Sequence, residues 1–398
     1  MEDFSSESLE ETLTREVEQV VRGDWTGPVR YPDLPIMIWW TPFTGDDGVQ
    51  QCGDHKCFVT NDRKYRAHPS VKTFFFYGTD FQPYDVPVPR RKGEDWALLH
   101  EESMKNNAHF CHEEMMRHFN HTSTFRLHSD LPLTTQYLES LEMITDPTYL
   151  LSLESKNRLV EEGLAPVAYV QSSCDTPSMR DLWVEEFSKH IKVDSYGSCL
   201  NNKPLPPSLA GSEQFENREY FSLLAKYKFV IAVENAVCDD YVTEKLWRTL
   251  MVGAVPIYLG AGNIEDYLPN QNSAVLVKDF DSAKGVADFV LSLHHNDEQY
   301  VRYLRHKAAY NNDPSTLVTN SLLREMLSQR QWGVSREQQR DLGNSVAHFQ
   351  CLVCQRVARN LKHTNIGFKP LPFDANIDHY GCPIPVNPKT FEVRKCKS

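Results

Sequence analysis

Short apolar runs that alternate with helix-like segments constrain the fold of this chain more than any other feature. Their lengths, and their polar, Pro or Gly borders, are typical of strands buried in a parallel sheet. Two series are present, residues 35–40, 71–77 and 95–100, and then residues 166–170, 192–195, 228–233, 254–259 and 273–277. Helix-like segments separate the runs of the second series, at residues 179–191, near Tyr220 and at residues 241–252. Because helical crossovers join parallel strands, the sequence predicts an α/β fold with two doubly wound, Rossmann-like units that face a cleft.

The boundaries of the predicted units follow from these two series. We expect residues 1–30 to form a polar tail, residues 31–150 a first domain, residues 151–345 a second domain, and residues 346–398 a Cys-containing segment that packs back on the first domain. Residues 101–134 are polar and rich in His and show little periodicity, so loops near a site are predicted there. A chain of 398 residues has enough material for two such cores.

The charge balance and the absence of long apolar runs limit the partners that are expected. The net charge is −12, whereas nucleic acids and anionic membranes bind basic surfaces, so neither is predicted as a partner. No apolar run is long enough to predict a membrane helix or a signal peptide. If the protein is secretory, we therefore expect its membrane anchor to lie outside this sequence.

Ten cysteines are more than a cytosolic chain of this size needs. Cys52 lies close to Cys57 in the sequence, and Cys351 lies close to Cys354. The second pair has the spacing of half a zinc site, but its remaining ligands would have to come from irregularly spaced positions. Disulfides formed in an oxidising compartment are therefore favoured over zinc for these four cysteines. The N-glycosylation sequon that begins at Asn120 fits the same compartment.

The most informative stretch follows the apolar run at residues 228–233. Glu234 and Asn235 end this run, and a helix is expected to open just after Asp240, with Asp239 or Asp240 as its N-cap. Ligands of open α/β sheets bind outside the carboxyl ends of the strands, which is where this loop lies. The loop and the start of the helix are therefore candidates for a binding site.

The expected helix has one charged face. Tyr241, Glu244, Lys245 and Arg248 recur at helical spacing, and Gly253 is well placed to end the helix. A helix N-terminus with a lysine in its first turns suits a diphosphate. An amphipathic helix with a solvated charged face explains the same spacing, and the spacing alone favours that simpler alternative.

A resemblance to a known family changes this balance. Residues 227–236, Asp240-Tyr-Val-Thr-Glu-Lys-Leu246 and residues 253–260 together resemble the signature of the α1,3-fucosyltransferase family, glycosyltransferase family 10. Glu102-Ser103, residues 124–130 and Met179-Arg180 resemble further motifs, so the likeness covers roughly residues 35–360. Details at residues 77–81, 100–103 and 131–138 are most similar to the divergent vertebrate branch. That branch resembles protein O-fucosyltransferases of the endoplasmic reticulum, which modify Ser or Thr in Cys-rich EMI domains.

The resemblance implies a GT-B fold, with an acceptor-binding domain at residues 31–150 and a GDP-fucose-binding domain at residues 151–345. It implies an inverting transfer of L-fucose from GDP-β-L-fucose to a protein or glycoprotein acceptor in the lumen of the endoplasmic reticulum or Golgi, with no cofactor. Glu102 is the implied catalytic base, and its neighbour Glu101 is the rival. Inverting transfer needs such a base at the acceptor hydroxyl and charge stabilisation at the departing diphosphate.

The resemblance also assigns roles in donor binding. Arg180 and Lys245 would neutralise the β-phosphate in place of a divalent ion. Tyr241 and Glu244 would hold ribose, guanine or fucose hydroxyls, and Asn235, beside Glu234, would lie at the strand-end turn. Two positions depart from the family pattern: Met104 stands where a proline is usual, and Tyr227 stands where some members have a disulfide cysteine.

Three alternatives stay open at this point. The acceptor is either a protein Ser or Thr or the N-acetylglucosamine of a glycan, to which fucose would be joined by an α1,3 bond. A metal-dependent glycosyltransferase of another sugar is the second alternative, because Asp279-Phe-Asp281 fits an Asp-x-Asp pattern, although Asp279 is expected to cap the helix that follows Ser282. His109 and His112 lack a clean zinc spacing, so no metal is predicted. A non-catalytic binder with the same fold is the third.

Overall fold

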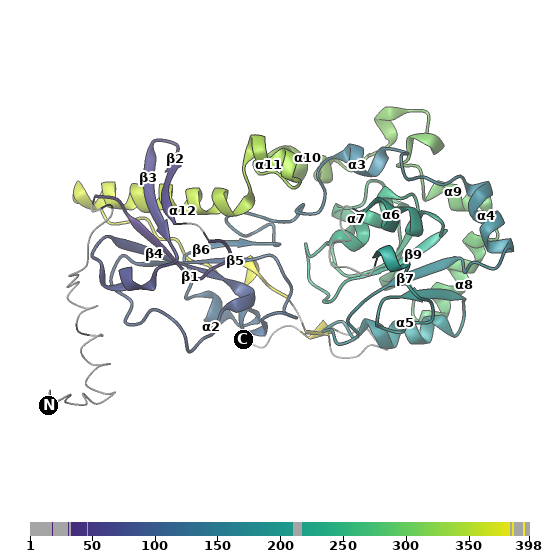
Figure 1. Ribbon diagram of the computed structural model, residues 1–398, viewed down its shortest axis with the longest axis horizontal. Helices are drawn as coiled ribbons and strands as arrows, with labels where there is room; N and C mark the ends of the chain where they lie inside the picture. The colour runs from purple at the N-terminus through teal and green to yellow at the C-terminus, as the bar shows by residue number, and fades with distance from the viewer. Residues whose placement is uncertain are drawn as a thin grey trace. The chain divides into compact units, whose positions relative to one another are not determined.

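In a computed structural model, the N-terminal third of the chain forms the first of two large sheets (Figure 1). The structure describes residues 31, 33–45, 47–209 and 217–382, together with Glu18 and the backbone of residues 384–385 and 393–394. The predicted tail at residues 1–30 lies outside the described residues, apart from Glu18. The chain divides into a first unit of residues 1–102, 106–133 and 343–380 and a second unit of residues 103–105, 134–342 and 381–398.

This division differs from the predicted domains at two places. Residues 134–150 belong to the second unit, because the short helix α3 (Leu141–Thr145) contacts α7 (Glu244–Met251). The segment predicted to pack back on the first domain is shared, since the first unit keeps it only as far as Tyr380. The chain therefore passes between the units several times.

The first unit contains a six-stranded sheet in the order β2-β3-β1-β4-β5-β6. Its neighbouring strands are parallel, except for the antiparallel hairpin of β2 and β3. The strands are β1 (Ile36–Thr41), β2 (Gly48–Cys52), β3 (His55–Thr60), β4 (Val71–Tyr77), β5 (Asp95–His100) and β6 (His121–Thr124). The predicted strands at residues 35–40, 71–77 and 95–100 are confirmed, whereas the region 101–134, expected to be loops, also contains β6 and the short helix α2 (Glu113–Met116).

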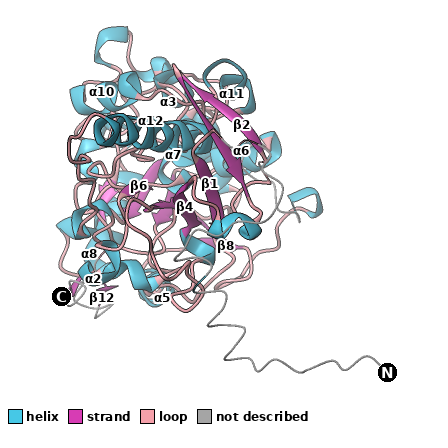
Figure 2. Ribbon diagram, turned by 90° about the vertical axis from the view of Figure 1, so that its left-hand side faces the viewer, coloured by secondary structure: helices cyan, strands magenta, loops and turns pink. Residues whose placement is uncertain are grey.

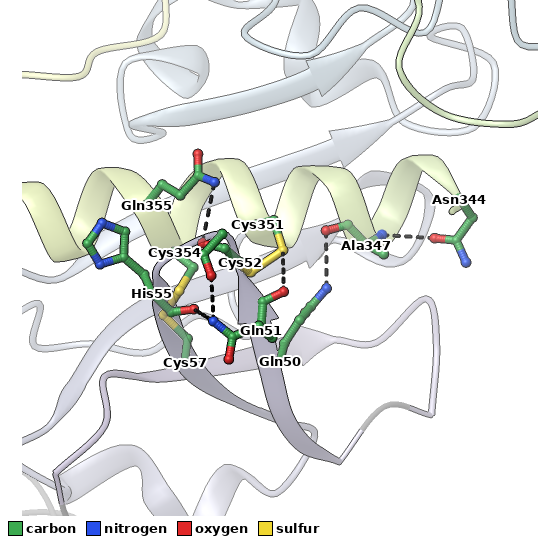
Figure 3. Close-up of a disulfide and its surroundings, with 11 residues drawn as sticks. Gln50, Gln51, Cys52, His55, Cys57, Asn344, Ala347, Cys351, Cys354 and Gln355 are labelled. Atoms are coloured by element: carbon green, nitrogen blue, oxygen red, sulfur yellow. Dashed lines mark hydrogen bonds between the residues drawn. A yellow bond between two sulfur atoms is a disulfide. The ribbon is translucent and has the colours of Figure 1, made fainter. Parts of the chain in front are cut away.

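A long helix, α12 (Ser345–Asn365), packs on one face of this sheet (Figures 1 and 2). Phe349 and Val353 from the helix share a buried cluster with Trp39 and Phe75 from the strands. Two disulfides, Cys52–Cys351 and Cys57–Cys354, join the hairpin to the helix (Figure 3), which confirms the predicted disulfides at these four positions. They close nearly the same loop of 299 and 297 residues, so the second bond chiefly fixes how the helix lies on the hairpin.

The second unit contains a five-stranded parallel sheet in the order β11-β10-β9-β7-β8. The strands are β7 (Val167–Val170), β8 (Val193–Tyr196), β9 (Phe229–Val233), β10 (Val255–Leu259) and β11 (Val275–Leu276). The helices, besides α3 and α7, are α4 (Leu153–Glu161), α5 (Arg180–Ser188), α6 (Arg218–Ala225), α8 (Ala283–His294), α9 (Asp297–Arg302), α10 (Ser321–Gln329) and α11 (Arg336–Leu342), and the short strands β12 (Ile384–Pro385) and β13 (Val393–Arg394) pair with each other.

Both faces of the second sheet are covered by helices. Trp183 of α5 and Val290 of α8 pack in one buried cluster with the strands, while Phe221 of α6 and Met251 of α7 pack in another. This arrangement, with a parallel sheet between layers of helices, confirms the predicted α/β class with Rossmann-like units. In the part of the chain that is described, no helix is both long and apolar enough to cross a membrane.

Candidate active site

A cavity of about 550 Å³ lies at the carboxyl ends of the second sheet, and all its lining residues belong to the second unit. Its wall includes Val170 at the end of β7, Gly197 just after β8 and Asn235 just after β9. Open α/β sheets bind ligands at this edge of the sheet. The lining residues are Lys105, Val170, Gln171, Ser172, Ser173, Arg180, Gly197, Ser198, Leu205, Leu209, Tyr220, Leu224, Val230, Ile231, Asn235, Glu244, Lys245, Arg248 and Thr249.

Arg180 is a buried cation on the wall of this cavity. It begins α5, and the residue before it, Met179, turns the chain with a left-handed φ of 48°. The Arg180 side chain is 1% exposed and donates to the backbone oxygens of Val233 at 3.1 Å and Ser173 at 3.2 Å. Its Nε has no hydrogen-bond partner, and no carboxylate among the described residues pairs with it. A buried guanidinium with only neutral partners is costly, so this position favours an anion in the cavity.

The N-terminus of α7 supplies a second cation. Thr243 is the N-cap of the helix, and it is held by the buried carboxylate of Glu234, which accepts from Thr243 N at 2.8 Å and Oγ1 at 2.7 Å. The Lys245 ammonium lies 3.3 Å from Glu234 Oε2 and 3.1 Å from Glu244 Oε1. Burial acts to lower the pKa of Lys245, but Glu244 and Glu234 raise it above its ordinary value. Lys245 is therefore a fixed positive charge at neutral pH.

The two carboxylates beside Lys245 are not equivalent. Burial raises the pKa of Glu234 above its ordinary value, although Lys245 opposes this shift. Burial also acts to raise the pKa of Glu244, but Lys245 and Arg248 outweigh it, so the pKa of Glu244 is lowered. Glu244 lines the cavity as a carboxylate, which is the form that accepts hydrogen bonds from hydroxyl groups.

The structure brings most of the predicted donor-binding residues together. Arg180, Asn235, Glu244 and Lys245 all line the cavity, whereas Glu234 is fully buried and supports α7. Tyr241 does not line the cavity and is only 2% exposed.

The start of α7 accounts for the position of Tyr241. The helix begins at Glu244 rather than at residue 241, and its N-cap is Thr243 rather than Asp239 or Asp240. Asp240 adopts a left-handed φ of 64°, and its carboxylate accepts hydrogen bonds from Asn263 and Tyr267. Tyr241 therefore does not share a helical face with Glu244. The helix ends where it was predicted to end, because Gly253 follows its C-cap with a left-handed φ of 65°.

The second unit contains two disulfides that the sequence did not indicate, and one of them lies beside the cavity. Cys174–Cys199 joins the loop after β7 to the loop after β8, and the neighbouring residues Ser173 and Ser198 line the cavity. Cys238–Cys382 joins the loop between β9 and α7 to the C-terminal segment. None of these four cysteines lies as close to another cysteine in the sequence as Cys52 does to Cys57 or Cys351 to Cys354, so that signal was absent here.

Sequence reasoning also missed several lining residues. Lys105 lies outside the recognised motifs, and Tyr220 was noted only as part of a helix. Arg248 was placed on the charged face of the expected helix but was not assigned a ligand. Its spacing of one helical turn from Glu244 and Lys245 was the signal that could have identified it.

In the first unit, Glu101 and Glu102 follow directly after β5. Glu101 Oε1 accepts a hydrogen bond of 2.8 Å from the hydroxyl of Tyr77, while Oε2 is buried without a partner. Burial raises the pKa of Glu101 above its ordinary value. The backbone oxygen of Glu102 accepts a 3.3 Å hydrogen bond from Tyr380, and the Glu102 side chain is half-buried.

The amide nitrogen of Asn120, the predicted glycosylation site, donates to Phe373 O at 2.8 Å, and its amide oxygen accepts from Trp96 N and Arg90. Glycosylation at Asn120 stays a prediction. The helix α8 is capped by Ser282 rather than by Asp279.

The Asp-x-Asp pattern lies on the surface. Asp279 and Asp281 are both exposed, and the described residues contain no group of three or more His, Cys, Asp or Glu side chains that could hold a metal ion. Independence from metal stays a prediction.

Comparison with known proteins identifies the family. Residues 160–366 match the domain described as glycosyltransferase family 10 (fucosyltransferase) C-term, and residues 32–137 match fucosyltransferase, N-terminal. The chain belongs to glycosyltransferase family 10. This confirms the predicted family and the predicted enzyme class, a fucosyltransferase.

Individual relatives of this family 10 member are similar over most of their length. The chain is 45% identical to GDP-fucose protein O-fucosyltransferase 3 of Danio rerio over 354 residues, which are 88% of this chain and 75% of that one. It is 45% identical to the Bos taurus protein of the same name over 353 residues, 88% of this chain and 72% of that one. A solved α1,3-fucosyltransferase with GDP-fucose aligns with a TM-score of 0.44 and 16% identity, covering 79% of this chain and 95% of that one.

Proposed function

We propose that this family 10 enzyme transfers L-fucose from GDP-fucose to a Ser or Thr hydroxyl of a secretory-pathway protein, with inversion and without a metal ion. The observation that carries the proposal is the buried Arg180 guanidinium, which faces the cavity of a fucosyltransferase-family domain without an anionic partner. The protein acceptor is supported by the name of the relatives, GDP-fucose protein O-fucosyltransferase 3.

The donor is proposed to bind in the cavity of the second unit. Arg180 and Lys245 would hold the diphosphate, because both are cations fixed on its wall. Glu244 would accept hydrogen bonds from hydroxyl groups of the donor, and the amide nitrogen of Asn235 would donate to them. Tyr220, Leu209 and other apolar lining residues would contact the flat faces of the nucleoside.

In the reaction, the acceptor oxygen attacks C1 of fucose on the face opposite the diphosphate. The bond from C1 to the β-phosphate oxygen breaks, and GDP leaves with the electron pair. The proton of the acceptor hydroxyl passes to the carboxylate of Glu102. Positive charges that are already in place when GDP departs stabilise the transition state without reorganisation, and removing one such contact typically costs about 100-fold to 1000-fold in rate.

Glu102 is proposed as the base rather than Glu101. One oxygen of Glu101 is already committed to Tyr77 and the other is buried, so its carboxylate is poorly placed to reach an acceptor. Glu101 instead accepts from Tyr77 of the neighbouring strand β4 and thereby ties the end of β5, just before Glu102, to that strand.

The lumen of the endoplasmic reticulum or Golgi is the proposed location. Four disulfides link described cysteines, and such bonds persist in oxidising compartments.

The test is a transfer assay with labelled GDP-fucose, a folded EMI domain and a biantennary glycopeptide, run in EDTA. We expect label on Ser or Thr of the EMI domain. Label on the glycopeptide alone would overturn the protein acceptor, and activity only after manganese is added would overturn the metal-independent mechanism.

A further inference from the structure

We propose that Lys105 is an additional donor-binding residue that contacts the diphosphate, and that the segment 103–105 thereby links donor binding to the position of Glu102. The inference rests on the proposed function and deepens it. The segment belongs to the second unit, although it directly follows Glu102 in the first. It therefore connects the proposed base, Glu102, directly to the donor-binding unit.

Lys105 lines the same cavity as Arg180 and Lys245. Its ammonium donates to the hydroxyl of Ser173 at 3.2 Å, and Ser173 is also the backbone partner of Arg180. No carboxylate among the described residues pairs with Lys105. An ammonium that lines a cavity beside a buried guanidinium, with one neutral partner, is suited to an anionic ligand.

A solvated surface lysine is the simpler explanation, and other lysines of the second unit show what that looks like. Lys278 pairs with Glu265 at 2.7 Å, Lys284 with Asp288 at 2.5 Å and Lys189 with Glu186 at 2.7 Å. Lys105 is exposed as well, but it lines the cavity and has the hydroxyl of Ser173 rather than a carboxylate as its partner. This contrast favours a ligand as its missing partner.

The chemistry of the leaving group explains why a further cation is useful. The diphosphate of GDP-fucose carries about two negative charges, and a third develops as the bond to C1 breaks. The charge of Lys245 is already shared with Glu244 and Glu234. Lys105 would supply positive charge that no protein carboxylate offsets.

The segment is fixed at its other end by Ser103. The Ser103 side chain is fully buried, and its hydroxyl donates to Asn235 Oδ1 at 2.5 Å. The backbone N–H of Lys105 donates in turn to the Ser103 hydroxyl at 3.2 Å. Lys105 and Asn235, the partner of Ser103, both line the cavity, so a ligand there would meet both residues that hold the segment. Ser103 is thus a positioning residue for Glu102, to which it is covalently joined.

The first experiment measures binding of GDP and GMP to the whole chain by calorimetry, with Lys105→Ala, Lys105→Arg and the control Lys284→Ala. We expect Lys105→Ala to weaken GDP binding about tenfold and GMP binding clearly less, with partial recovery in Lys105→Arg. The control should bind both nucleotides like the parent. Unchanged GDP affinity in Lys105→Ala would overturn the proposal, and so would equal losses for GDP and GMP, because the contact would then not be with the diphosphate.

The second experiment tests the positioning role with Ser103→Ala and the conservative Ser103→Thr. We expect kcat for fucose transfer to fall about tenfold in Ser103→Ala, with the KM for GDP-fucose and the GDP affinity within about twofold of the parent and recovery in Ser103→Thr. Parallel losses of GDP affinity and kcat, or no change in either, would contradict this role. The GDP and GMP binding measurements of the first experiment do not depend on the acceptor. A failure of the Lys105 proposal is therefore distinguishable from a failure of the proposed function, in which the parent enzyme would transfer no fucose.

Discussion

The two units hold their reactive side chains in different ways. In the second unit, cations line a cavity, and the disulfide Cys174–Cys199 joins two loops that line it. In the first unit, the candidate groups are the carboxylates Glu101 and Glu102, and the disulfides lie away from them, between the β2–β3 hairpin and α12 (Figure 3).

The difference follows from the chemistry that each unit is proposed to perform. A diphosphate needs several cations at fixed positions, so cross-linked loops favour its binding. A base needs only one carboxylate within reach of the acceptor hydroxyl, so a single residue at the end of a strand can supply it without cross-linked loops. The predictions below test this division of roles.

The largest effect is expected from the carboxylates of the first unit. Glu102→Gln should lower kcat about a thousandfold and leave GDP affinity unchanged, because a general base contributes roughly 100-fold to 10,000-fold. Glu101→Gln keeps the hydrogen bond to Tyr77 and should cost about tenfold. Steady-state transfer kinetics check this, and a larger loss for Glu101→Gln would reverse the two roles.

The disulfides of the two units should differ in what they affect. Replacing Cys174 and Cys199 with Ala should weaken GDP binding about tenfold, since the loops after β7 and β8 line the cavity. Replacing Cys57 and Cys354 with Ala should lower the free energy of unfolding by about 2 kcal/mol without changing GDP affinity. Urea unfolding and calorimetry separate the two cases. Equal effects on GDP affinity would remove the distinction between the units.

A smaller effect concerns stability in acid. His100 in the first unit is fully buried with neither ring nitrogen bonded, and burial lowers its pKa to about 3. In the unfolded chain His100 takes up a proton near pH 6.5, whereas in the folded chain it stays neutral until about pH 3. The free energy of unfolding should therefore fall as the pH drops from about 6.5 toward 3. His100→Leu loses no hydrogen bond and should flatten this decline by roughly 1–3 kcal/mol. Urea unfolding at pH 7 and pH 4.5 measures it, and an unchanged slope would contradict the assignment.

Much of the fold could be predicted because buried parallel strands are apolar along their whole length. The run at residues 228–233 is such a case, and β9 occupies it. Strand β6 was missed because its residues, His121–Thr124, are polar, yet all four are buried. Several of their polar groups bond to residues distant in the sequence, such as Arg356 and His379, and hydropathy cannot show such contacts.

The candidate site was predicted where motif and local structure agree, and missed where they do not. Arg180 and Lys245 lie at the starts of helices that follow recognisable segments, and both line the cavity. Tyr241 does not line the cavity, and the left-handed Asp240 and the Thr243 cap place the start of the helix after it, which the helical spacing in the sequence did not indicate. Lys105 lines the cavity because residues 103–105 pack with the second unit although they follow a strand of the first. No spacing in the sequence could predict this.

The central claim is that fixed side-chain cations take up the negative charge of departing GDP. Its most direct test is the rate of fucose transfer in EDTA by a variant that carries both Arg180→Met and Lys245→Met, with its circular dichroism compared with the parent. The account predicts a folded protein whose transfer rate is at least about a thousandfold below that of a parent that is fully active in EDTA. A double variant that transfers fucose at the parental rate would contradict the account.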